Sequence, residues 1–249
     1  MNELLQDVLL IVPCYNEASR LQIKEFRQAA AQGLQFCFAN DGSTDGTLAL
    51  LQKEWASEPR VQIFNAPQNL GKAEVIRHAA LDLLKRGELQ KRQIQWVGFW
   101  DADLATPLSE VLLFRSYHQA FGAKKHAIFG SRVLRLGAHI VRSPMRHYLG
   151  RLFATLASQL LHLQSYDSQC GAKLIHVSRV SDVYSQPFLS KWIFDVEMIL
   201  RLGQDTIIEC PVSEWRDVPG SKVKVSREAL RVIRDLFRIR EKYLRGAGL

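Results

Sequence analysis

The sequence contains few cysteines, no long apolar run and no low-complexity segment. Its four cysteines are scattered along the chain, without the spacing of a zinc site or the density of a disulfide framework. The first residues lack the basic start and the small-residue cleavage site of a secretory signal. No stretch approaches the roughly 18 consecutive apolar residues of a membrane-spanning helix. We therefore expect a cytoplasmic protein in a reducing compartment, without a transmembrane span.

Two further patterns are missing: histidine pairs at metal-site spacing, and aromatic residues interleaved with the basic ones. The first absence argues against a histidine-bound metal, and the second against a nucleic-acid platform. The chain is nevertheless basic, with 33 lysines and arginines against 25 acidic residues and a formal net charge of +8. Much of this charge falls in residues 132–151 and 222–245. It suits a phosphorylated substrate or an anionic membrane surface, and we expect no nucleic-acid partner.

What is present is an alternation of short apolar runs with helical stretches. With 249 residues, 47% of them hydrophobic, a single domain is expected. Strands buried on both faces read as continuous apolar runs, so the alternation predicts an α/β fold with a mainly parallel central sheet and flanking helices. Ligands then bind beyond the carboxyl ends of the strands. The predicted strands are residues 8–12, 34–39, 61–64 and 95–100, and the predicted helices are residues 18–32, from 44 onward, 72–85, 108–121, 145–163 and 226–245.

The fourth apolar run ends on two carboxylates, in the segment WDADLATP at residues 100–107. In an extended chain Asp101 and Asp103 point the same way, while the small Ala102 packs on the opposite side and leaves room for a flat group. Two like charges at one spot repel each other unless a cation separates them. Mg²⁺ or Mn²⁺ fits, because such an ion takes few protein carboxylates and completes its shell with phosphate oxygens. The alternative is that Asp103 caps a helix and Asp101 is merely solvated.

The segment NDGSTDGT, residues 40–47, follows the second predicted strand. Its glycines permit a tight turn, and Ser43 or Thr44 is placed to cap the next helix. Asp41 is then free at the strand tip, where its carboxylate can accept bonds from a nucleobase or a ribose. The alternative is a capped turn without a ligand.

The segment PCYNE, residues 13–17, follows the first predicted strand. Pro13 lacks an N–H and is expected to end the strand ladder. Tyr15 offers an aromatic face to a base. Glu17 either caps its own helix or accepts a ribose hydroxyl.

These segments, in this order, resemble family 2 glycosyltransferases, which have the nucleotide-diphospho-sugar transferase (glycosyltransferase A) fold. Within that family the chain is similar to dolichyl-phosphate β-glucosyltransferases and to polyprenyl-phosphate mannose and glucose synthases. The resemblance implies an inverting transfer of a hexose, glucose from UDP-glucose in this branch, to a polyprenyl phosphate, with Mg²⁺ or Mn²⁺ as cofactor. The segments that carry it are VPCYNE, NDGSTDGT, NLGKAEVIRHA, DADLATP, FGSR, DSQCGAKL, WIFDVE and CPVSEWRDVPGSKV, spread over residues 8–240.

Carried over by position, the resemblance assigns a role to each motif. Residues 8–130 become the nucleotide-sugar half and residues 131–249 the acceptor half of one domain. The implied metal ligands are Asp101 and Asp103. The implied nucleotide-sugar-binding residues are Pro13, Tyr15, Glu17, Asp41, Asp101, Ala102, Asp103, Gln169 and Asp195. The implied catalytic residues are Asp103, Arg132, Asp167 and Lys222, the last in a loop expected to close over the donor.

Three other features are judged from their surroundings. Ala73 stands where many family members have glycine, which weakens a phosphate role for Gly71 and Lys72. Cys170 has no base near it in the sequence, so we expect no nucleophilic cysteine. Trp192 and Phe194 are expected in the core.

A phosphate acceptor changes what the enzyme has to supply. Its second pKa is about 6, so it is already largely anionic near neutral pH and needs no general base. Arg132 or Lys222, together with the metal, is expected to stabilise the departing nucleoside diphosphate. Asp167 is expected to orient the sugar or an arginine. The acceptor phosphate is expected to meet a set of arginines, which otherwise form a solvated face: Arg132, Arg142, Arg146 and Arg151.

Two helical runs, residues 145–163 and 226–245, carry apolar side chains at helical spacing and many cations. Both can lie flat on an anionic bilayer, which predicts peripheral attachment to the cytoplasmic face of a membrane. The alternative is that each helix packs on its own domain. Two other functions stay open as well: transfer to a soluble or glycan acceptor, and a nucleotide-sugar-binding protein of the membrane surface without catalysis.

Overall fold

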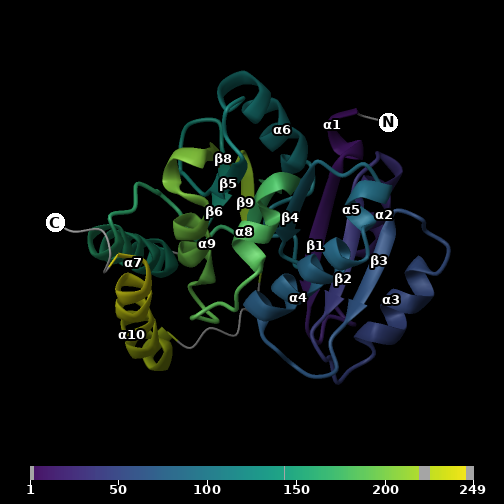
Figure 1. The fold of residues 1–249 in the computed structure, drawn as a ribbon, viewed down its shortest axis with the longest axis horizontal. Helices are drawn as coiled ribbons and strands as arrows, with labels where there is room; N and C mark the ends of the chain where they lie inside the picture. The colour runs from purple at the N-terminus through teal and green to yellow at the C-terminus, as the bar shows by residue number, and fades with distance from the viewer. Residues whose placement is uncertain (1–2, 143, 219–224, 245–249) are drawn as a thin grey trace.

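The computed structural model of the chain describes residues 3–142, 144–218 and 225–244, without the side chains of residues 144–147, 149 and 225–230. Its centre is a seven-stranded sheet in the order β3-β2-β1-β4-β7-β5-β8 (Figure 1). Only β7 runs antiparallel to its neighbours, so the expected mainly parallel sheet is confirmed. The strands are β1 (Val8–Cys14), β2 (Gln35–Asn40), β3 (Val61–Asn65), β4 (Trp96–Trp100), β5 (Ala127–Ser131), β7 (Ala172–His176) and β8 (Ile207–Pro211), and a separate pair joins β6 (His139–Val141) to β9 (Glu214–Arg216).

The four predicted strands are β1 to β4. The expectation that Pro13 ends the strand is wrong by one residue, because β1 pairs with β2 as far as Cys14 opposite Asn40. Pairing with β4, on the other side, already stops at Ile11 opposite Phe99. The missing N–H of Pro13 therefore falls where β1 has a partner on one side only.

The helices flank the sheet as expected, and α2, α3 and α6 begin later than predicted. Residues 18–32 were expected to be helical, but α2 begins only at Ile23, because the amides of Arg20 and Leu21 donate to the carbonyl of Glu17 in a preceding turn. The predicted helix at 72–85 is confirmed at both ends. The helices are α1 (Glu3–Gln6), α2 (Ile23–Ala31), α3 (Thr47–Trp55), α4 (Lys72–Lys85), α5 (Glu88–Lys91), α6 (Glu110–Phe121), α7 (Pro144–Leu161), α8 (Val180–Tyr184), α9 (Phe194–Leu202) and α10 (Val225–Leu244).

Hydrophobic packing on both faces of the sheet explains why its strands read as continuous apolar runs. In β1, Leu9 and Ile11 pack in one core cluster, with α4, α8 and α9. Val8, Leu10 and Val12 pack in the other, with α2, α3 and α6. Because alternate side chains point to opposite faces, all five residues from Val8 to Val12 are buried.

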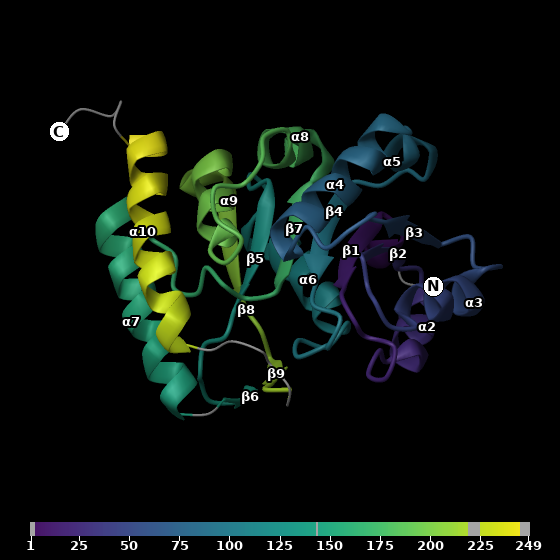
Figure 2. The same ribbon diagram turned by 90° about the horizontal axis from the view of Figure 1, so that it is seen from below.

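The helices α7 and α10 lie side by side at the end of the molecule away from α2 and α3 (Figure 2). One face of each packs on the domain, through Ala157 and Leu161 of α7 and Leu236 and Ile239 of α10. Within the described residues no helix combines the length and the hydropathy needed to cross a bilayer.

The topology fixes where a ligand can bind. From β1 the chain adds β2 and then β3 on one side of the sheet, whereas β4 lies on the other side of β1. The strand order therefore reverses between β1 and β4. Open parallel sheets bind ligands beyond the carboxyl ends of their strands at such a switch point. The acidic segments after β1, β2 and β4 all begin there.

Candidate active site

The two carboxylates after β4 belong to a turn. The extended geometry expected for them is wrong, because Leu104 has a φ of 52° and its amide donates to the carbonyl of Asp101 at 3.1 Å. Asp103 caps no helix: its carboxylate accepts from the amide of Ala105 at 3.1 Å, and α6 begins only at Glu110. Burial raises the pKa of Asp103, and the charge of Asp101 raises it further. The two carboxylates are thus electrostatically coupled, as a shared cation site requires.

The cation beside this pair in the structure is Lys72, at the start of α4. Its Nζ lies 2.5 Å from Oδ1 of Asp101 and 5.2 Å from the centre of the Phe99 ring. Burial would lower the pKa of Lys72, but the charges of Asp101 and Asp195 outweigh it and raise the pKa. Lys72 is therefore a cation at neutral pH.

Gly171 allows the carboxylate of Asp101 to lie against the backbone directly before β7. A Cβ on Gly171 would stand 1.9 Å from Oδ2 of Asp101, and the amide of Asp101 donates to the carbonyl of Gly171 at 3.1 Å. The segment DSQCG was recognised in the sequence, but the reason for its glycine appears only in this contact.

These residues fit a divalent metal. Asp101 and Asp103 offer hard carboxylate oxygens, and Gly171 makes room for the carboxylate of Asp101. No cluster of three or more histidine, cysteine or acidic side chains that could hold a metal occurs in the parts of the chain that the structure describes. A pair of carboxylates suits Mg²⁺ or Mn²⁺ that takes its remaining ligands from water and substrate phosphate.

Asp41 is buried at the end of β2, and its carboxylate is not free as expected. One oxygen accepts from the amide of Leu70 at 2.7 Å and the other from the amide of Gly71 at 2.9 Å. Burial raises its pKa, against the effect of these two bonds. Because an ionised carboxylate has about four acceptor positions, Asp41 keeps capacity for a ligand while it fixes the loop that leads to Lys72.

The segments after β1 and β2 are joined to each other. The amide of Asn16 donates to the hydroxyl of Ser43, and its side-chain oxygen accepts from the amide of Thr44 at 2.9 Å. Neither Ser43 nor Thr44 caps α3, because Asp45 accepts from the amide of Thr47 instead. The expected cap by Ser43 or Thr44 is therefore wrong, because both residues bond to the neighbouring segment.

Glu17 and Tyr15 lie at this joined edge. Glu17 caps no helix, because its carboxylate forms an ion pair with Arg20 in the turn before α2. Its amide donates to the hydroxyl of Thr47 at 2.8 Å. Tyr15 is 38% exposed and presents its ring at the surface. A base can reach Tyr15, whereas Glu17 already has a cationic partner.

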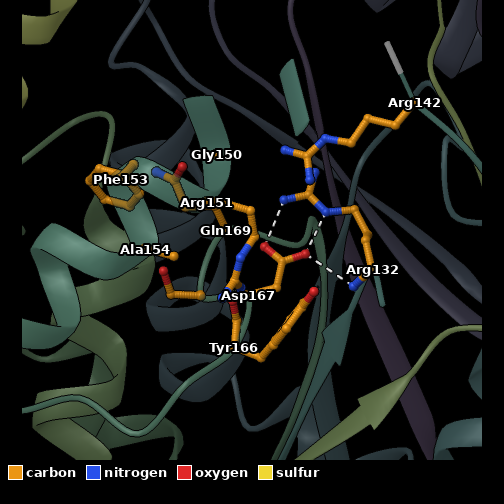
Figure 3. A pocket seen from close by; sticks show the side chains of 10 residues that line it. Arg132, Arg142, Gly150, Arg151, Phe153, Ala154, Tyr166, Asp167 and Gln169 are labelled. Carbon is orange, nitrogen blue, oxygen red and sulfur yellow. Dashed lines mark hydrogen bonds and ion pairs between the residues drawn. The ribbon is translucent and has the colours of Figure 1, made fainter. Parts of the chain in front are cut away.

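Three of the four arginines expected to meet the acceptor phosphate line one pocket (Figure 3). They are Arg132, Arg142 and Arg151, and Asp167 and Gln169 lie in the same pocket. Arg146 belongs to α7, but its side chain is outside the described part, and Lys222 lies outside the described residues. The charge pattern suggested that the arginines of residues 132–151 act together, and the fold brings three of them into one pocket.

Asp167 holds Arg132 in this pocket. The guanidinium donates to the two carboxylate oxygens at 2.6 and 2.7 Å, and the Arg132 amide donates at 3.0 Å (Figure 3). Burial would raise the pKa of Asp167, but the charge of Arg132 outweighs it and lowers the pKa. A carboxylate held ionised in this way is a poor proton acceptor, which supports the expectation that Asp167 orients an arginine.

The other two arginines lie around this pair. Arg142 points toward Arg132 (Figure 3), and burial together with the charge of Arg132 lowers its pKa. Its guanidinium lies so close to Gly150 of α7 that a Cβ there would stand 2.5 Å from it. Arg151 stacks over the ring of Tyr166 at 4.1 Å. Repulsion between Arg132 and Arg142 favours an anion that binds between them.

Asp195 lies beneath the site and is paired with a lysine that the sequence gave no reason to select. Its Oδ1 accepts from Nζ of Lys173 at 2.6 Å, and both side chains are buried. The same Nζ donates to the carbonyl of Cys170 at 2.6 Å. Direct contact of Asp195 with a donor stays a prediction, since its observed partner is internal.

Several further residues complete the site. Glu209 of β8 accepts from the hydroxyl of Ser165 and from the amides of Tyr166 and Asp167, which fixes the segment that presents Asp167. Trp192 was expected in the core but is 43% exposed, and its carbonyl accepts from Gln169 at 3.4 Å. No local signal in the sequence distinguishes such an exposed tryptophan from a buried one.

Two predictions about single residues are supported. Phe194 is buried as expected. Burial raises the pKa of the Cys170 thiol to about 11. Because the thiolate is the reactive form, this supports the absence of a nucleophilic cysteine.

Comparison with known proteins places this geometry in a family. Residues 9–120 match the family model described as Glycosyl transferase family 2. Dolichyl-phosphate beta-glucosyltransferase ALG5A of Trichomonas vaginalis is 30% identical over 251 residues, 92% of this chain and 72% of the relative. Dolichyl-phosphate beta-glucosyltransferase of Saccharomyces cerevisiae is 27% identical over 95% of this chain and 75% of the relative. The chain spans about two thirds to three quarters of the length of such relatives.

Solved structures show the same fold. Glucosyl-3-phosphoglycerate synthase from Mycobacterium tuberculosis, in complex with Mn²⁺, UDP and glucosyl-3-phosphoglycerate, superposes with a TM-score of 0.65. It shares 16% of its sequence and covers 94% of this chain and 80% of its own. At this identity the likeness concerns the fold, and it confirms the expected glycosyltransferase A architecture.

Proposed function

This chain belongs to glycosyl transferase family 2, and from that premise we propose that it transfers glucose from UDP-glucose to the phosphate of a dolichyl-type polyprenyl lipid, with inversion at the anomeric carbon. The observation that carries the proposal is the pocket lined by Arg132, Arg142 and Arg151 beside the acidic turn. Burial would lower the pKa of Arg132, but the charge of Asp167 outweighs it and raises the pKa; the charge of Asp101 adds a smaller contribution, so the two places are close enough to interact. An anionic acceptor needs such cations, whereas a neutral hydroxyl acceptor does not.

The donor would lie over the carboxyl ends of β1, β2 and β4. Tyr15 and Asp41 would contact the uridine, with Pro13 and Glu17 shaping the same edge, and Asp101 and Asp103 would hold Mg²⁺ or Mn²⁺ on the diphosphate. When bound, the metal supplies positive charge that stabilises the leaving diphosphate. Residues 8–130 would thus contribute the donor half of the site and residues 131–249 the acceptor half.

The acceptor phosphate would bind Arg142 and Arg151, with Arg132 held in place by Asp167. One phosphate oxygen forms a bond to the anomeric carbon while the bond from that carbon to the diphosphate breaks, and UDP leaves with the electron pair. No proton has to be removed from the acceptor, because a phosphate monoester is already anionic. This agrees with the lowered pKa of Asp167, because a carboxylate with a low pKa is a poor general base.

The lipid part of the acceptor requires a membrane surface. The outer face of α7 carries Tyr148, Leu152 and Leu156, which are 73%, 58% and 38% exposed, one turn apart. The outer face of the adjacent α10 carries Ile233 and Phe237 among arginines. Apolar side chains flanked by cations bind the interface of an anionic bilayer. We place the protein peripherally on the cytoplasmic face of a membrane, with these two helices toward the lipid.

A soluble phosphorylated acceptor is the second candidate, because the arginine pocket recognises a phosphate whatever carries it. The solved neighbour described above was obtained with glucosyl-3-phosphoglycerate, a soluble phosphorylated product. The exposed apolar faces of α7 and α10 favour the lipid acceptor, since a soluble substrate gives them no role.

A turnover assay separates the candidates. The protein is incubated with UDP-glucose and Mn²⁺, and with either a short-chain polyprenyl phosphate or 3-phosphoglycerate. The proposal predicts a glucosylated lipid phosphate, a strong loss of rate in Arg142→Gln, and an unchanged rate in Lys124→Gln, which removes an exposed charge after α6. Product only from 3-phosphoglycerate would establish the second candidate, and no transfer to either acceptor would contradict both.

A further inference from the structure

We propose that Gly150 of α7 is a positioning residue for the acceptor phosphate, because its missing side chain lets the guanidinium of Arg142 lie against the helix in the arginine pocket. The proposal rests on the proposed function and extends its acceptor site to a residue without a functional group. Its consequence is that one methyl group added to α7 weakens the binding of a phosphate monoester without weakening the fold.

The guanidinium of Arg142 occupies the place where a side chain on residue 150 would begin. A Cβ on Gly150 would stand 2.5 Å from Nη2 of Arg142, 3.4 Å from Cζ and 3.6 Å from Nη1. The first of these distances is too short for any real Cβ, so one of the two groups would have to move. Both residues line the same pocket (Figure 3). Because an arginine side chain has many rotamers, the guanidinium would move and the helix would stay.

Glycine is an unfavourable residue at this place in the chain. The helix α7 extends from Pro144 to Leu161, so residue 150 lies more than one turn from either end. Glycine has the lowest helix propensity of all residues except proline, because its backbone loses the most conformational freedom on folding. Alanine would favour the helix, and the three atoms nearest to its methyl group would all belong to Arg142. The glycine therefore serves the position of this arginine.

The position of Arg142 depends on this contact more directly than the positions of its neighbours do. The two other arginines of the pocket are fixed by the partners described above, an aspartate and a tyrosine ring. Arg142 lies over Gly150 and near Arg132, whose charge repels it. A phosphate between the two guanidinium groups removes this repulsion. The surface of α7 at Gly150 thus sets how closely Arg142 can approach the phosphate.

Gly150→Ala should separate acceptor binding from stability. We expect the variant to bind a phosphate monoester about tenfold more weakly, which is the loss expected for one hydrogen bond between charged groups. Its unfolding midpoint in urea should equal that of the wild type or rise, because alanine favours the helix. In the Arg142→Gln background the same change should cost less than about twofold, since the shorter side chain has no guanidinium to displace.

Calorimetry measures the binding of a short-chain polyprenyl phosphate and, in a parallel titration, of 3-phosphoglycerate, which distinguishes a lipid phosphate from a soluble one. Gly150→Ala should weaken whichever of the two the wild type binds. The affinity for UDP with Mn²⁺ should stay the same, because the donor half is untouched. Gln159→Ala changes an exposed position of the same helix outside the pocket and should bind every ligand as the wild type does.

The outcomes separate this inference from the proposed function. If Arg142→Gln loses affinity for the phosphate and Gly150→Ala does not, the glycine has no positioning role although the acceptor site stands. A lower urea midpoint of Gly150→Ala, or an undiminished effect in the Arg142→Gln background, would also overturn the inference. If the wild type binds neither phosphate, or neither variant changes the binding, both proposals fail. Binding of the lipid phosphate without transfer of glucose would contradict the proposed function alone.

Discussion

At the scale of single residues, the acidic side chains of the site differ in whether their partner is internal. Asp167 and Asp195 are buried against Arg132 and Lys173. The carboxylate of Asp103 accepts a hydrogen bond from the amide of Ala105 within its own turn, and the charge of Asp101 repels it. Asp167 and Asp195 therefore hold other groups in place, whereas the turn of Asp101 and Asp103 has two carboxylates beside the single cation Lys72 and gains from a metal.

The ion pair of Asp167 makes a testable contribution to stability. Because the native pKa of Asp167 is lowered, this contribution is complete above the unfolded carboxyl pKa of about 3.9 and is lost as the pH falls through the lower native pKa. Asp167→Asn should lower the free energy of unfolding by about 3 kcal/mol near neutral pH, because Arg132 stays buried without its counter-charge.

Urea unfolding of both proteins between neutral pH and pH 3 checks this. The difference between them should shrink toward the acidic end. Asp182→Asn, which breaks the exposed pair with Arg179, should cost less than about 1 kcal/mol. An equal loss for Asp167→Asn at every pH would show that the carboxylate charge is not what matters.

Gly171 offers a second test at this scale. In Gly171→Ala the new methyl group would displace the carboxylate of Asp101, since its position lies 1.9 Å from Oδ2. We expect Mn²⁺-dependent binding of UDP to fall about tenfold or more, as measured by calorimetry. Gly46→Ala is the control, because a Cβ there meets its nearest neighbour only at 3.9 Å. Equal affinity in the two variants would separate Asp101 from the metal site.

At the scale of elements, the buried carboxylate of Glu197 helps to tie α10 to the body of the molecule. Glu197 of α9 is fully buried and accepts from Arg201 at 2.7 Å, from the hydroxyl of Tyr243 at 2.8 Å and from the amide of Leu189 at 2.8 Å. The motif WIFDVE was recognised in the sequence, but its glutamate proves to connect three segments. The C-terminal helix therefore has a packed face as well as its exposed apolar one.

Glu197→Gln should loosen α10 before it unfolds the whole domain. It leaves Arg201 buried without its counter-charge, which costs about 3 kcal/mol. Hydrogen exchange should rise first in α10, and Glu25→Gln, at an exposed site of α2, should stay within about 0.5 kcal/mol of the wild type. Uniform acceleration of exchange across the sheet would contradict a local role.

The exposed faces of α7 and α10 make a prediction about lipid. Leu152→Glu with Phe237→Glu should reduce binding to vesicles that contain anionic lipid by about tenfold or more, because both changes put charge where apolar side chains would enter the interface. Flotation measures this. The control double variant Phe121→Glu with Leu136→Glu adds the same charge at more exposed positions off these helices and should bind as the wild type does. Equal loss in the two would show that only net charge counts.

At the scale of the whole molecule, the sequence predicted the layers better than the contacts. Continuous apolar runs identified β1 to β4 because burial on both faces leaves a local signature. The order of motifs predicted a glycosyltransferase of family 2, and this is confirmed. The antiparallel β7 and the edge strand β8 carry no such signature, since their partners lie far away in the chain.

The residues that the sequence did not reveal are those whose function depends on distant partners. Lys72 meets Asp101 and Glu209 meets Asp167 across 29 and 42 positions, which no local pattern encodes. The prediction that Trp192 lies in the core was wrong for the same reason, because no local pattern encodes its exposure. The motif residues themselves were found because family order marks them, but their hydrogen bonds, such as those of Asp41 to the next loop, required the structure.

The central claim is that metal-bound UDP lies on the turn of Asp101 and Asp103, facing the arginine pocket. Crystals grown with UDP and MnCl₂ test it through anomalous scattering of manganese. The account predicts one strong peak within bonding distance of both carboxylates, with the uracil ring against Tyr15 and the diphosphate toward Arg132. A manganese peak elsewhere, or UDP bound with this turn empty, would contradict it.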